Sequence, residues 1–226
     1  MIMPSYDLQI SELSRNKTPR IPVCFCIELP AEGTDRAEFN RLTNSLNRLV
    51  DKFRNSDAFK YSTDYCIITF RESVYVQCDF GEVMDGELSM SYMPGKPNLK
   101  AALLEAYKRI RIRLKSYDAV GRARKGTVLF VLSSGATSEP LGDLASQISY
   151  YSNTHGMEVI PFVYGNGDDS ALQELTVSGV TYRCVSGIDK VFDLLGKSIQ
   201  SMSESSARNM LNLGESAEWD SYRKKG

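Results

Sequence analysis

Two acidic residues, Glu28 and Glu32, stand on either side of Pro30 directly after the apolar run IPVCFCI at 21–27. Carboxylates at this spacing could hold a divalent cation, because Mg²⁺ and Ca²⁺ are bound through oxygen ligands. They could also act as an acid and a base if their surroundings pushed their pKa values apart. No third catalytic group accompanies the pair, and two acids in one loop are most often solvated turn residues. We therefore favour a structural or partner-contacting role over catalysis.

Other residues with chemical potential have simpler structural interpretations. The single histidine, His155, precedes a glycine in NTHGMEV, which is typical of a helix end with a glycine C-cap. Cys24 and Cys26 are two apart in a predicted strand, so they share a face and are predicted to be buried free thiols rather than zinc ligands. The stretch GNGDD at 165–169 lacks the third glycine and the long helix of a dinucleotide-binding loop. The sequence shows neither a nucleophile elbow nor a Walker A loop.

A basic stretch, KRIRIRLKSYDAVGRARK at 108–125, holds eight Lys or Arg residues against one Asp. Such a surface could bind an acidic protein or, less plausibly, nucleic acid. The alternative that we favour is a solvated helix face followed by an exposed loop, with Ile110 and Leu114 directed to the core. If the stretch does bind a partner, the contacting residues would be Arg109, Arg111, Arg113, Arg122, Arg124 and Lys125.

These candidate residues lie among segments that alternate between strand and helix patterns. The run 21–29 is apolar without polar alternation, as expected of a strand covered on both faces. The segment 35–53 has apolar residues at helical spacing, with Thr34 as a possible N-cap. The segment 64–80 is predicted to form two antiparallel strands, because the polar tip at 71–73 is too short for a crossover. The segment 98–117 is predicted to be a helix with one apolar face.

The remaining segments continue the alternation to residue 202. Strands are predicted over 126–135, 157–165 and 180–186, the last as an edge strand, and helices over 141–153, 170–176 and 188–202. This order predicts an α/β three-layer sandwich, with a mostly parallel six-stranded sheet, one antiparallel edge strand and helices on both faces. The predicted organisation is an N-terminal arm at 1–20, one domain at 21–202 and a charged C-terminal tail at 203–226.

The order of elements and four local stretches resemble the von Willebrand factor A (VWA) domain. The stretches are the strand ending at Glu28, ITFRESV at 68–74, TVLFVLSSGATSEP at 127–140 and IPFVYGNGDDSALQEL at 160–175. The resemblance covers about residues 21 to 201 and implies a Rossmann-like fold. It also implies a metal-ion-dependent adhesion site, in which Asp-x-Ser-x-Ser, a Thr and an Asp in a Thr-Asp-Gly turn hold Mg²⁺ for a partner's carboxylate.

The resemblance places a changed residue at every side-chain ligand position of that site. Proline offers no side-chain oxygen, and a glutamate is one methylene longer than the aspartate that Mg²⁺ geometry favours. The site is therefore predicted to be degenerate, with no metal and no cofactor, and its loops are predicted to contact a partner. The corresponding residues are Glu28 for the Asp, Pro30 and Glu32 for the serines, Pro97 or Asn98 for the Thr, and Ser133, Ser134 and Gly135 for Thr-Asp-Gly.

Bulk properties narrow the function further. The formal net charge is −1, no apolar run approaches the roughly 20 residues of a membrane span, and residues 1–20 lack the apolar core of a signal peptide. Five cysteines without scaffold spacing favour a reducing compartment, so we expect a soluble cytoplasmic domain without membrane contact.

The preferred hypothesis is a non-enzymatic adaptor that binds a protein partner. The resemblance to intracellular bacterial members implies a stress-response or kinase- and phosphatase-linked setting. The alternatives left open are a metal-dependent VWA module with a non-standard site, and an enzyme or nucleotide binder that shares only the architecture.

Overall fold

The structure, a computed structural model, describes most of the chain. The described residues are 13, 18–31, 33, 36–82, 84, 86–164, 168–176, 179–184, 187–204 and 219–223. Glu32, the proposed N-cap Thr34, residues 165–167 of the glycine-rich stretch and most of the predicted arm at 1–20 lie outside this set.

A single seven-stranded sheet forms the middle layer, in the order β3-β2-β1-β4-β5-β6-β7. Five neighbouring strands, β2, β1, β4, β5 and β6, are parallel to one another. Strand β3 runs antiparallel to β2 at one edge. This arrangement confirms the predicted α/β class, and the tip at 71–73 joins β2 to β3 as expected. The strands are β1 Ile21–Glu28, β2 Thr63–Phe70, β3 Val74–Cys78, β4 Thr127–Ser133, β5 Met157–Val163, β6 Val180–Cys184 and β7 Trp219–Arg223.

A seventh strand extends the predicted six-stranded sheet beyond β6, so β6 is not the edge strand that the sequence predicted. Residues 219–223, from the segment predicted to be a charged tail, pair antiparallel with β6, with Trp219 opposite Cys184. An edge strand presents unpaired backbone N–H and C=O groups, and another strand can pair with these whatever side chains it carries. The charged composition of the C-terminal segment therefore did not indicate that it contains a strand.

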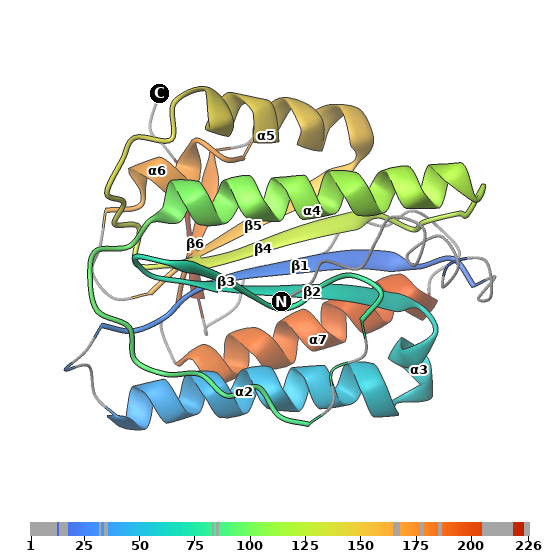
Figure 1. Cartoon of the computed structure of the whole chain (residues 1–226), viewed down its shortest axis with the longest axis horizontal. Coiled ribbons are helices and arrows are strands. Elements are labelled where there is room, and N and C mark those ends of the chain that lie inside the picture. The colour runs from blue at the N-terminus through green and yellow to red at the C-terminus, as the bar shows by residue number, and fades with distance from the viewer. Residues whose placement is uncertain are drawn as a thin grey trace.

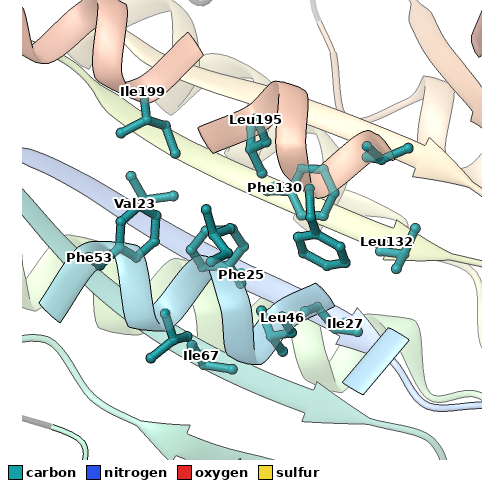
Figure 2. Close-up of a cluster of buried hydrophobic side chains, with 14 of the residues drawn as sticks. Val23, Phe25, Ile27, Leu46, Phe53, Ile67, Phe130, Leu132, Leu195 and Ile199 are labelled. Atoms are coloured by element: carbon teal, nitrogen blue, oxygen red, sulfur yellow. The ribbon is translucent and has the colours of Figure 1, made fainter. Parts of the chain in front are cut away.

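Helices cover both faces of the sheet (Figure 1). On one face lie α2 Arg36–Asn55, α3 Asp57–Lys60 and α7 Ile188–Glu204, and on the other lie α4 Leu99–Ala119, α5 Asp143–His155 and α6 Ser170–Gln173. The apolar stripe of α2 recurs every three or four residues and is buried, as the sequence predicted. Figure 2 shows this core, in which Phe25 of β1 lies between Phe53 of α2 and Phe130 of β4, with ring centroids 6.0 and 5.9 Å away.

The second core lies beneath α4 and α5. Cys24 and Cys26 both belong to it, which confirms that they share one face of β1. Together with Cys66 and Cys78 they are buried free thiols. At the end of α5, His155 is followed by Gly156 in the left-handed conformation (φ 64°), the C-cap that the sequence predicted. Within the described residues, no helix is both long and apolar enough to cross a membrane.

Candidate functional site

The parallel register brings the candidate residues together at the carboxyl ends of the central strands. Glu28 ends β1 opposite Phe70 of β2, so Arg71 follows at the same edge of the sheet. On the other side of β1, Ile27 is opposite Leu132 of β4, which places Ser133 and Ser134 beside Glu28. From this edge the chain enters α2 after β1 and α5 after β4, and α4 also begins there (Figure 1). This is the edge at which open α/β sheets bind their ligands.

The carboxylate of Glu28 is buried and fully engaged with hydroxyl and amide donors. Its residue is 1% exposed. Oε2 accepts hydrogen bonds from Ser133 Oγ at 2.7 Å and from the Ser134 backbone N–H at 2.8 Å, and Ser134 Oγ lies 2.9 Å from both carboxylate oxygens. The phenol of Tyr164 faces the same group, and burial, the charge of Glu28 and a hydrogen bond to it raise the pKa of Tyr164.

Arg71 supplies the positive charge of the site. Its Nη1 lies 3.3 Å from Glu28 Oε1 and also donates to the carbonyl of Leu29 at 3.0 Å. Its Nε donates to the carbonyl of Gly95 at 2.9 Å. The side chain is 13% exposed. One guanidinium therefore neutralises Glu28 and joins the loop after β1 to the loop before α4.

Backbone contacts join the other loops of this edge. The N–H of Asn98 donates to Arg71 O at 2.7 Å, while the Asn98 side chain caps α4 by accepting from Ala101 N. The N–H of Ser138 donates to the carbonyl of Pro97 at 3.0 Å. Gly135 has φ +80°, and a Cβ there would overlap the backbone carbonyl oxygen of Asp168, so only glycine fits. The loops thus form one connected unit.

Most of the predicted partner-binding residues form the floor of this unit, and their contact with a partner stays a prediction. Ser134 and Asn98 are half-buried, and Glu32 lies outside the described residues. The buried members are Glu28, Pro30, Pro97, Ser133 and Gly135. The exposed rim consists of other residues, namely Glu72, Lys96, Ala136, Ser138, Glu139 and Asp168, and these we call the loop rim.

The predicted basic surface is broken by two arginines that point into the protein. Arg113 is 0% exposed, and its Nε lies 2.5 Å from Asp64 Oδ2, which also accepts from Tyr117. Arg109 is buried in an ion pair with Asp79. Buried carboxylates demand buried partners, and this requirement outweighs the preference of arginine for solvent. The spacing carried a signal, because Arg113 lies three residues after Ile110 and four before Tyr117, on the core side of α4.

The remaining members of the basic stretch do not form one continuous cationic face. Arg111 is exposed and lies over the ring of Tyr107, with 5.4 Å between its Cζ and the ring centroid. Arg122 donates through Nε to the carbonyl of Leu13, and Lys125 donates to the carbonyl of Ser203. Several of these cations therefore hold segments of the chain together.

Arg71 is the functional residue that sequence reasoning missed. The tip at 71–73 was interpreted only as a turn between two strands. The available signal was a cation placed immediately after a strand that is parallel to, and adjacent to, the strand ending in Glu28. Among the residues that the structure describes, no group of three or more His, Cys, Asp or Glu side chains is arranged to hold a metal ion.

Comparisons with known proteins identify the fold. No protein-family model matches the sequence, and no curated protein matches it significantly. Proximal thread matrix protein 1 from the mussel byssus, solved with a zinc-occupied MIDAS motif, superposes with a TM-score of 0.55 at 13% identity, over 83% of this chain and 47% of that one. The pilus adhesin SpaC of Lactobacillus rhamnosus GG gives a TM-score of 0.60 at 11% identity, over 82% and 31%.

A von Willebrand factor type A protein from Catenulispora acidiphila gives a TM-score of 0.49 at 12% identity, over 82% of this chain and 42% of that one. The chain thus spans less than half the length of each of these proteins. At sequence identities this low, the likeness concerns the fold alone. The chain has the fold of von Willebrand factor A domains.

Proposed function

We propose that this chain is a non-enzymatic protein-interaction domain of the VWA type that binds its partner without a metal ion. The surface that we assign to the partner is the loop rim at the carboxyl edge of the sheet. The proposal includes the cytoplasmic, stress-response or kinase- and phosphatase-linked bacterial setting that the sequence resemblance implies.

The observation that carries the proposal is the ion pair between Glu28 and Arg71. In the resembling family, a divalent cation sits beside the acidic residue that ends the first strand. Here the guanidinium of Arg71 lies beside that residue, and two serines occupy its oxygens. A Mg²⁺ ion would have to displace Arg71 and assemble near-octahedral oxygen ligands at about 2.0–2.1 Å, beside Pro30 and Pro97, which have no side-chain oxygen.

Arg71 also links neighbouring loops, as a bound metal ion would. A bound ion links the loops that coordinate it, and Arg71 links the loops around Leu29 and Gly95 through direct hydrogen bonds. The loop rim is therefore held in shape without a metal ion. The rim carries both charge signs, because Lys96 and the acids Glu72 and Glu139 are all exposed. We therefore expect docking by shape and hydrogen bonds.

Calorimetric titration with Mg²⁺ and Mn²⁺ tests metal independence. We expect no saturable heat and no change in melting temperature between millimolar Mg²⁺ and EDTA. Saturable binding in the wild type that is lost in Glu28→Gln would overturn the proposal in favour of a metal-dependent module.

Affinity capture from a lysate of the source organism tests the surface. Charge reversal must avoid Glu28 and Arg113, because both are buried and a reversed charge there would strongly destabilise the fold. The loop-rim variant is therefore Lys96→Glu with Glu139→Lys, and the helix variant is Lys108→Glu with Arg111→Glu, all at exposed positions. We expect a partner captured in EDTA to be lost only in the loop-rim variant. Loss only in the helix variant would place the partner on α4 and contradict the assignment.

A further inference from the structure

A cavity of about 660 Å³ lies at the amino-terminal ends of β4, β5 and β6. Thr127 and Met157, the first residues of β4 and β5, line it together with Arg124 from the loop before β4. The seven residues of β4 separate it from the Glu28–Arg71 site by roughly 20 Å. Its volume lies in the range of about 300–1,000 Å³ that is usual for small-molecule sites.

Alternation along β5 sorts the lining residues between the two faces of the sheet. Met157 belongs to the core beneath α4 and α5, and Val159 packs against that core. Thr127 is the register partner of Met157 in the adjacent parallel strand, so it faces the same side. Glu158 points to the opposite side, where burial and the Glu158 carboxylate raise the pKa of Tyr182. The acidic residue of the cavity is thus turned away from Thr127.

Arg124 supplies positive charge on the side of α5. It is half-buried, and its charge opposes the rise that burial causes in the pKa of Tyr151 on α5. In the described part of the chain, no carboxylate forms a salt bridge with Arg124. A guanidinium presents five N–H donors in a planar fork that suits carboxylate, sulfate and phosphate groups.

The hydroxyl of Thr127 is a second group without a hydrogen-bond partner among the described residues. The residue is 1% exposed, and its Oγ1 makes no hydrogen bond within the described residues. Buried hydroxyls are ordinarily paired, so each exception asks for an explanation. The other buried polar atoms of this kind belong to residues that do not line the cavity. An acceptor atom of a ligand would satisfy Thr127.

We propose that this cavity binds a small organic anion. The anionic group lies between the Arg124 guanidinium and the Thr127 hydroxyl, and an apolar body rests against Met157 and Val159. The site is separate from the loop rim, so it stands or falls independently of the proposed partner binding.

Two fluorescent probes of similar shape test the proposal on the full chain. One is 8-anilinonaphthalene-1-sulfonate, and the other is N-phenyl-1-naphthylamine, which lacks the sulfonate. We expect saturable binding of the sulfonate at one site. Arg124→Gln should weaken it at least about tenfold, since hydrogen bonds to charged groups have about this effect on affinity, and should change binding of the neutral probe less than about twofold.

Three further variants complete the test. Val159→Trp fills the cavity and should abolish binding of both probes, while Thr127→Val keeps the side-chain shape and should weaken the sulfonate about threefold. The matched control is Arg111→Gln, an exposed arginine on α4 outside the cavity, which should bind like the wild type. The proposal is overturned if the wild type binds no sulfonate, or if Arg124→Gln and Arg111→Gln bind it equally well.

Discussion

Replacing Arg71 with methionine removes the charge that neutralises Glu28 and keeps most of the side-chain length. Removing one partner of a buried ion pair costs about 3–5 kcal/mol, because the other charge is left uncompensated. Glu28 would still accept from Ser133 and Ser134, and the Arg71 side chain is 13% exposed. We therefore expect Arg71→Met to lower the free energy of unfolding by about 3 kcal/mol.

A double-mutant cycle separates charge from packing. Glu28→Gln removes the charge, so Arg71→Met should cost much less in that background, with a coupling energy of about 2 kcal/mol between the two positions. The control is Arg54→Met, because Arg54 also donates to two backbone carbonyls, but its acidic partner, Asp51, is exposed. We expect the control to cost about 1 kcal/mol.

Urea unfolding followed by circular dichroism at 222 nm provides these free energies. The reasoning is refuted if Arg71→Met costs no more than Arg54→Met, or if the Arg71 and Glu28 substitutions are additive within about 0.5 kcal/mol. Either result would mean that the buried carboxylate does not depend on the guanidinium.

Three other perturbations have expected outcomes. Arg113→Met should lower the free energy of unfolding in urea by about 3–5 kcal/mol, because it strands a buried aspartate, whereas exposed Arg111→Met should change it by less than about 0.5 kcal/mol; equal effects would contradict the burial. Burial raises the pKa of the Cys26 thiol, so above pH 9 the unfolded chain loses a proton that the folded chain keeps, and stability falls as pH rises. In urea unfolding between pH 10 and 11, Cys26→Ala should reduce the loss of unfolding free energy by about 1.4 kcal/mol per pH unit. An unchanged dependence on pH would contradict the raised pKa of Cys26. Gly135→Ala should lower the melting temperature more than Gly33→Ala, because both glycines have positive φ but only the first would overlap a neighbouring backbone oxygen; the reverse order would contradict the close approach.

The Glu28–Arg71 pair gives a physical reason why the fold can persist without a metal at this edge. Loops at the carboxyl ends of parallel strands carry polar backbone groups, which need partners when they are buried. Arg71 satisfies the carbonyls of Leu29 and Gly95 in addition to the Glu28 carboxylate. A guanidinium suits this task because its donors point in several fixed directions at once.

Local periodicity was enough to predict the layer architecture, because it reports which face of each element is buried. The helix predicted over 98–117 corresponds to α4, and Ile110 and Leu114, which were predicted to face the core, are buried. The short connection at 71–73 was enough to predict the antiparallel edge strand. The common face of Cys24 and Cys26 followed from the period of a strand.

The positions of the buried charges, in contrast, depend on contacts between distant parts of the chain. Arg71 meets Glu28 across 43 residues of sequence, and Arg113 meets Asp64 across 49. Local spacing places Arg113 on the core side of α4 and Arg71 at the end of β2, but it identifies neither carboxylate partner, because each partner is brought close only by the fold. The pairing of Trp219–Arg223 with β6 likewise depends on a distant segment, because an open sheet edge binds a strand through backbone hydrogen bonds. Local spacing specifies which face of a helix or strand is buried. The partners of buried charges and of edge strands are specified only when the chain has folded.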